Sequence, residues 1–201
     1  TAREDFEKSM EELASLAKAC YMEPVGIITQ RLESADKGLY IGAGKVQEVK
    51  EAVEALEADI LLFDEPLANL DPATGKTAID LIDRVWKEYH KTVVIIEHRL
   101  EDVLYRDVDR IVLVNDGRIV ADMTPDQMMA ADILGKYGIR EPLYVTALKY
   151  AGVKVEEAHR AGRLVTLDIP AVQDAVLKWS SETQEKEKKE ETVNGFGDLK
   201  T

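Results

Sequence analysis

Apolar and polar residues follow one another along the chain in periods typical of alternating helices and buried strands. Phe6, Met10, Leu13 and Ala17 recur at spacings of three and four, which predicts an amphipathic helix over residues 4–20. A second helix is expected on the apolar stripe between residues 46 and 56, and a third after residue 71. Short runs of branched apolar residues predict buried strands at four segments: 25–29, 59–63, 92–97 and 110–114.

Turn residues divide the second half of the chain. Asn115-Asp116-Gly117 predicts a tight hairpin, with the chain returning antiparallel over 118–122. Thr124-Pro125-Asp126-Gln127 combines a capping side chain, a proline and a reciprocating glutamine, which predicts a helix start. Further helices are expected at 141–151, 154–161 and 170–179. The charged tail, poor in apolar residues, is expected to be disordered or a frayed helix extension.

These elements together predict an α/β fold with three layers and a mainly parallel sheet, followed by a helical appendage. We divide the chain into four parts. Residues 1–58 are the helix-strand-helix part, and residues 59–135 are the acid-bearing part in the same sheet. Residues 136–180 are the helical appendage and residues 181–201 the disordered tail.

Composition narrows the class of partner. A chain of 201 residues with 45% hydrophobic content can bury one sizeable core, or one core plus a small appendage. The net charge of -13 argues against nucleic acid, whose phosphates are bound by Lys and Arg. No apolar run approaches the ~18 residues that span a bilayer, so we expect no membrane insertion. Cys20 is the single cysteine, which suits a reducing compartment, and we expect a cytoplasmic protein.

Acidic residues follow the second predicted strand. Asp64 and Glu65 come directly after Ile60-Leu61-Leu62-Phe63, so they are expected at the carboxyl edge of the sheet. Such acids can orient Mg²⁺ and activate a water, but many buried strands end in acids simply because they reach solvent. The residues that come next, Leu67-Ala68-Asn69-Leu70-Asp71-Pro72, and the Glu97-His98 pair after the following strand favour the chemical interpretation.

Together these motifs resemble the Walker B, D-loop and switch-histidine segments of ABC-transporter ATPases. With Tyr137-Gly138-Ile139-Arg140-Glu141-Pro142, the stretch from about 58 to 180 resembles the ATPase subunits of energy-coupling-factor importers for cobalt and vitamins. The resemblance implies a Mg²⁺ role for Asp64, a general-base role for Glu65, and contact of His98 with the γ-phosphate. It also implies that Asp71 contacts a second copy across a nucleotide-sandwich dimer, so a homodimer is one alternative.

The phosphate-binding half of such a site is missing from the sequence. No Gly-x-x-x-x-Gly-Lys-Ser/Thr, Q-loop or signature motif occurs, and the nearest match, Gly42-Ala43-Gly44-Lys45, is followed by Val46 where a hydroxyl is needed. Gly42, Gly44 and Lys45 are therefore candidates for weak anion binding at a helix start, or simply for a tight turn into a helix. We expect no tightly bound cofactor, with ATP and Mg²⁺ implied by ancestry only, and no enzymatic activity from this chain alone.

The first third of the chain has a different resemblance. The segments 10–13, 26–30 and 40–45 resemble the amino-terminal domain of HflX-type GTPases, which associate with ribosomes, up to about Glu65. The GTP-binding domain of that family has no counterpart here. Because both resemblances share residues 56–65, we interpret the chain as an engineered chimera joined within equivalent strands, with natural rearrangement as the alternative. The alternatives for function are an ATP-binding fragment or subunit of an importer and a ribosome- or partner-binding module.

Overall fold

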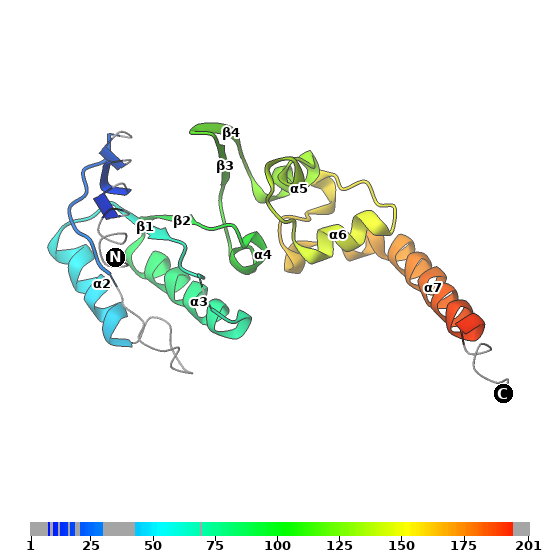
Figure 1. Ribbon diagram of the computed structural model, residues 1–201. Coiled ribbons are helices and arrows are strands. Elements are labelled where there is room, and N and C mark those ends of the chain that lie inside the picture. The colour runs from blue at the N-terminus through cyan, green and yellow to red at the C-terminus, as the bar shows by residue number, and fades with distance from the viewer. Residues whose placement is uncertain are drawn as a thin grey trace. The chain divides into compact units, whose positions relative to one another are not determined.

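The computed structural model describes residues 8, 10, 11, 13–15, 17, 18, 21–29, 43–68 and 70–194. The chain divides into two compact units, Thr1–Ile96 and Glu97–Thr201. Each unit combines helices with a small two-stranded sheet, one parallel and one antiparallel, which confirms the α/β class (Figure 1).

The first unit holds the parallel pair of strands. The described residues between 8 and 18 are helical, as predicted. They are followed by α2 (Ala43–Ala55), β1 (Ile60–Asp64), α3 (Pro72–Tyr89) and β2 (Thr92–Ile96). Strand β1 runs parallel to β2, with Asp64 opposite Ile96 at the shared carboxyl end.

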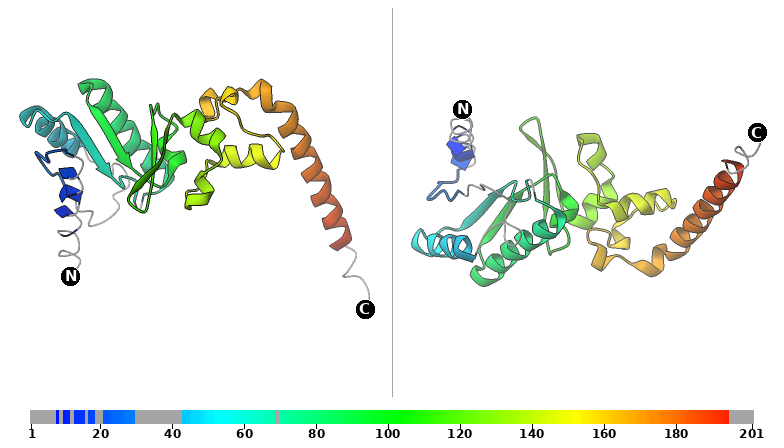
Figure 2. Two further views of the ribbon diagram at one scale, coloured as in Figure 1. Left: turned by 90° about the horizontal axis from the view of Figure 1, so that it is seen from above. Right: turned by 60° about the horizontal axis from the view of Figure 1, so that its bottom comes forward.

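Side chains from α2 and α3 cover one face of this sheet. Val53 of α2, Leu61 of β1 and Val85 of α3 form a buried cluster, against which Phe63 and Val93 pack. Figure 2 shows both helices beside the strands. The opposite sheet face is apolar but exposed, with between 38% and 44% of each residue accessible at Ile60, Leu62, Val94 and Ile96.

The predicted strand at 25–29 is wrong. The backbone of residues 22–29 has no strand structure, and Val25 and Ile27 are exposed. Gly26 instead lies against the end of α2, where an added Cβ would come within 2.5 Å of Leu56 Cδ1. Branched residues favour a strand only when a neighbouring strand supplies hydrogen bonds, and no described strand pairs with this segment.

The second unit begins with α4 (Leu100–Val103) and the predicted hairpin. Strands β3 (Ile111–Asn115) and β4 (Arg118–Met123) pair antiparallel, and Asp116 and Gly117 turn the chain with φ of 49° and 70°. This confirms the hairpin. The described strands form two separate pairs, β1–β2 parallel within the first unit and β3–β4 antiparallel within the second. One mainly parallel sheet running through both units stays a prediction.

Helices form the rest of the second unit. Helix α5 (Pro125–Ala131) starts with the predicted capping box: Gln127 N donates to Thr124 Oγ1 at 3.3 Å, and Thr124 N donates to Gln127 Oε1 at 3.2 Å. The later elements are η1 (Leu134–Tyr137), α6 (Leu143–Tyr150), η2 (Glu157–His159), η3 (Leu164–Thr166) and α7 (Ile169–Asn194). Their core includes residues with at most 3% exposure, Leu104, Met128, Met129, Leu134, Val145, Leu148, Ala161 and Val172.

The tail that we expected to be disordered from residue 181 is helical as far as Asn194, as the alternative of a helix extension allowed. Most of its residues are Glu, Lys, Gln, Ser and Thr, and the first three are strong helix formers. Lys178 and Glu182 also stand four positions apart, with Nζ and Oε1 4.0 Å apart. The predicted helix at 154–161 is shortened to the 3₁₀ turn η2.

Candidate functional site

The carboxyl end of β1 presents the two acids that the sequence singled out. Asp64 is the last residue of the strand, and Glu65 follows in the left-handed region with φ of 43°, a conformation that non-glycine residues seldom adopt. Backbone bonds hold this turn, because Glu65 N donates to Ile96 O at 2.9 Å and Ala68 N donates to Glu65 O at 3.0 Å. Both acidic side chains are exposed at the sheet edge. Strain of this kind, held by surrounding structure, is typical of functional turns.

Buried residues anchor the loop after the acids. Pro66 and Leu67 are buried, and Leu67 is fully inaccessible. The loop therefore has a fixed attachment directly after Glu65. Asn69, part of the motif quoted above, lies outside the described residues.

Asp71 is the N-cap of α3. Its Oδ1 accepts from Ala73 N at 2.9 Å and from Thr74 N at 3.1 Å, and its Oδ2 accepts from the Thr74 hydroxyl at 2.5 Å. The hydroxyl and amide of Thr74 lower the pKa of the Asp71 carboxyl. The carboxylate is therefore ionised at neutral pH and holds the first turn of its own helix. A contact of Asp71 across a dimer stays a prediction.

The glycine-rich stretch continues into a helix. Gly44 and Lys45 lie in the first turn of α2, as expected for residues at a helix start. Gly42 lies outside the described residues. Weak anion binding at this helix start stays a prediction.

His98 belongs to the second unit and lies two residues after β2. Its side chain is 64% exposed, whereas that of the neighbouring Glu97 is only 3% exposed. Glu97 Oε1 accepts from His98 N at 2.9 Å and from Arg99 N at 3.1 Å, and it lies 3.3 Å from His98 Nδ1. From the sequence we named Glu97 as part of the Glu97-His98 pair and gave it no role of its own. The feature that could have indicated one is its position between a buried strand and a histidine.

Side chains that could bind a metal do not form a cluster among the described residues. No group of three or more His, Cys, Asp or Glu side chains comes together among residues 43–68, 70–194 and the described amino-terminal positions. Asp64 alone would be one carboxylate ligand, whereas Mg²⁺ in nucleotide sites is shared with phosphates and waters. The Mg²⁺ role of Asp64 therefore stays a prediction. Within the described helices, none is long and apolar enough to cross a membrane.

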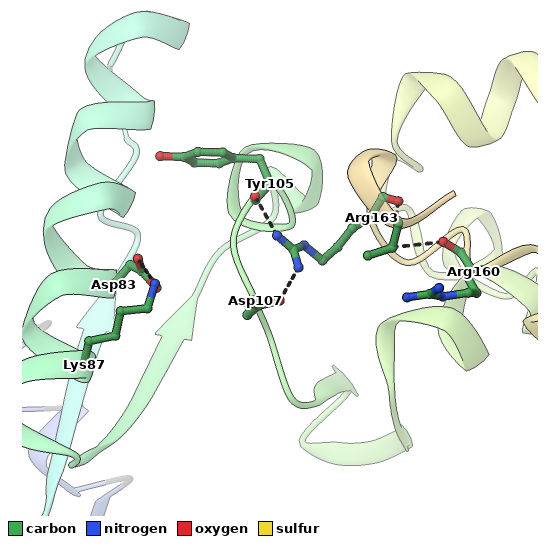
Figure 3. A network of polar contacts seen from close by, with 7 residues as sticks. Asp83, Lys87, Tyr105, Asp107, Arg160 and Arg163 are labelled. Carbon is green, nitrogen blue, oxygen red and sulfur yellow. Dashed lines mark hydrogen bonds and ion pairs between the residues drawn. The ribbon is translucent and has the colours of Figure 1, made fainter. Parts of the chain in front are cut away.

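Two polar contacts away from the acids each lie within one unit. In the second unit, Arg163 pairs with Asp107 and its Nη2 donates to Tyr105 O at 3.3 Å, which ties the segment after η2 to the loop before β3 (Figure 3). In the first unit, Lys87 and Asp83 pair along α3 with Nζ and Oδ2 2.8 Å apart. Both networks stabilise their own unit.

Two family models match separate parts of the chain. Residues 7–73 match the model described as GTP-binding GTPase N-terminal, and residues 131–194 match the one described as ATP-binding cassette cobalt transporter. Both resemblances seen in the sequence are confirmed, and a chimeric architecture is consistent with them. The first match extends beyond residue 65 and the second beyond residue 180, where we expected the resemblances to end.

Relatives of the chain carry the name ABC transporter ATP-binding protein. One from Photobacterium profundum is 51% identical over 140 residues, which is 69% of this chain and 25% of the relative. One from Clostridium perfringens is 44% identical over 191 residues, 94% of this chain and 33% of the relative. One from Streptococcus pneumoniae is 57% identical over 113 residues, 56% of this chain and 20% of the relative. The chain thus spans about a fifth to a third of the length of these relatives.

Proposed function

We propose that this chain contributes the Walker B acids of an ABC transporter ATP-binding protein. To hydrolyse ATP it needs phosphate-binding residues that lie outside these 201 residues. The observation that carries the proposal is the Clostridium relative, which aligns with 94% of the chain at 44% identity. From the sequence we interpreted the chain as an engineered chimera, with a fragment or subunit of an ATP-binding importer protein as one alternative. Because one natural protein aligns with almost the whole chain, the alignment supports that alternative more strongly than the engineered chimera.

The strand end supplies the hydrolytic groups. Asp64 would orient Mg²⁺ and its waters, and Glu65 would take a proton from the attacking water. Bound Mg²⁺ would neutralise charge on the phosphate oxygens. His98 would contact the γ-phosphate. The observations that support these roles are the position of Asp64 at the end of β1 and the strained, exposed turn at Glu65.

Electrostatics argues against turnover by the chain alone. A triphosphate is held by a cradle of backbone N–H groups and a lysine, and Mg²⁺ needs a Ser or Thr hydroxyl next to the acid. Without these groups, two carboxylates face an anionic ligand. Each unit-charge repulsion at ~4 Å costs about 1–4 kcal/mol at the effective dielectric of water or a protein surface.

Phosphate release tests both halves of the proposal. The chain with saturating ATP and Mg²⁺ should release phosphate at the background rate, and so should Glu65→Gln. Turnover that Glu65→Gln abolishes would contradict the proposal for the isolated chain. This chain grafted in place of the 191 aligned residues of the Clostridium relative should give ATPase activity that the same substitution removes. A folded graft whose activity is unchanged by Glu65→Gln would refute the role of the acids.

The match to a GTPase amino-terminal domain supports a second candidate, a ribosome-binding module. The net charge of -13 disfavours it, because phosphate backbones repel an acidic surface. We expect no co-sedimentation with ribosomal subunits at physiological salt. Stable co-sedimentation would favour this candidate.

A further inference from the structure

The carboxylate of Glu97 is buried next to an exposed imidazole. Only 3% of the Glu97 side chain is accessible, against 64% for His98. Burial of a carboxylate is costly unless hydrogen bonds satisfy it. Glu97 Oε1 meets this need through two consecutive backbone amides, those of His98 and Arg99.

The same oxygen lies beside the histidine ring. Glu97 Oε1 is 3.3 Å from His98 Nδ1. A negative charge at this distance favours a proton on Nδ1 over one on the far nitrogen, Nε2. The two backbone bonds hold the peptide that carries the ring, and the carboxylate lies next to Nδ1 of that ring.

We propose that Glu97 is the positioning residue for His98, fixing the backbone of the turn and holding Nδ1 so that Nε2 is the nitrogen turned toward a ligand. The role of His98 toward phosphate rests on the proposed function. The positioning by Glu97 does not need a nucleotide and can be tested without one. A purely structural alternative is that Glu97 only holds the turn before α4, whose N-cap residue Arg99 makes no side-chain capping bond.

Nitrogen-15 NMR of the imidazole rings distinguishes these alternatives in the full chain. Above the pH at which the ring signals stop changing, the shifts of the two nitrogens report which one carries the proton. We expect His98 to be protonated on Nδ1. His159 is an internal contrast, because its Nδ1 accepts a hydrogen bond from Glu156 N at 3.0 Å and must be unprotonated. A wild-type His98 with its proton on Nε2 would overturn the proposal.

The variant Glu97→Gln keeps an oxygen acceptor for the two amides but removes the charge. We expect the ratio of the Nδ1–H to the Nε2–H form of His98 to fall by about fivefold or more, with His159 unchanged. An unchanged ratio in a folded variant would mean that Glu97 only holds the turn. If the variant does not fold, the His159 shifts move to those of an unfolded chain, because the bond from Glu156 N is lost, and the wild-type tautomer then decides. Failure of the grafted ATPase would leave these ring measurements unaffected, so the two proposals fail separately.

Discussion

Among the described glycines of the second unit, Gly162 is the position where an added methyl group should be least tolerated. A Cβ built on it would lie 2.7 Å from three atoms at the start of α5: Asp126 N, Asp126 Oδ1 and Pro125 Cβ. Real Cβ atoms essentially never come so close to other heavy atoms. Two of these three atoms belong to the backbone or to a proline ring, which cannot swing aside. The Gly162→Ala change must therefore move either the segment before Arg163 or the first turn of α5.

The cost has two parts. Overpacking of a well-packed site typically costs about 1–3 kcal/mol. The shift would also stretch the bond that Gly162 N donates to Asp126 Oδ1 at 2.7 Å, and a hydrogen bond to a charged group contributes about 1.5–3 kcal/mol. Because the bond would be strained and not removed, we expect Gly162→Ala to lower the free energy of unfolding of this unit by about 2–4 kcal/mol.

Urea unfolding followed by tryptophan fluorescence measures this loss. The chain has two tryptophans, so a Trp86→Phe background leaves Trp179, which stacks on Tyr150 with ring centroids 6.3 Å apart, as the reporter of the second unit. Gly135→Ala is the matched control, because its Cβ would meet no atom within 4 Å and its φ is not positive. The reasoning is refuted if both alanine variants unfold at the same urea concentration.

Four further predictions concern other parts of the fold. Thr124→Ala should destabilise the second unit by about 1 kcal/mol in urea unfolding, while Thr124→Ser should not, because the hydroxyl caps α5. Burial raises the pKa of the Tyr144 phenol above the unfolded value of about 10, so the folded state holds the phenol proton more tightly than the unfolded state. The contribution of the neutral phenol to the free energy of unfolding is therefore complete below about pH 10 and falls as the pH rises above it. Tyr144→Phe should reduce the fall in urea midpoint between about pH 9 and 11. Amides of residues 184–186 in α7, which are exposed, should exchange hydrogen much faster than those of residues 172–179, since a helix without packing is marginal in water. Leu61→Ala should lower the free energy of unfolding of the first unit by about 2–5 kcal/mol and Leu62→Ala by less than about 1 kcal/mol, measured by urea unfolding with Trp86 as the reporter in a Trp179→Phe background.

Features determined by a few neighbouring residues could be predicted from the sequence. The capping box at Thr124, the hairpin turn at Asp116 and the start of α3 at Asp71 each depend on side chains that bond within their own segment. The position of Asp64 at a strand end followed from the apolar run before it. Each of these expectations agrees with the structure because no distant partner is needed.

Features that need a distant partner could not be predicted. Residues 25–29 have strand-forming side chains, but a strand also requires a neighbour, which the local pattern does not reveal. The burial of Glu97 and the left-handed backbone of Glu65 depend on how β2 and β1 end in three dimensions. Composition gave no indication of either feature.

The adjacent leucines of β1 differ in burial although both belong to one apolar run. Leu61 is 7% exposed and faces α2 and α3, whereas Leu62 is 38% exposed on the other face. The continuous apolar run is what a strand covered on both faces needs, yet Leu62 on the second face keeps 38% of its surface accessible. A small loss on Leu62→Ala would agree with an uncovered face. A loss as large as that of Leu61→Ala would show that the face is covered in solution, and an unfolding midpoint that rises with protein concentration would then identify the cover as a second copy.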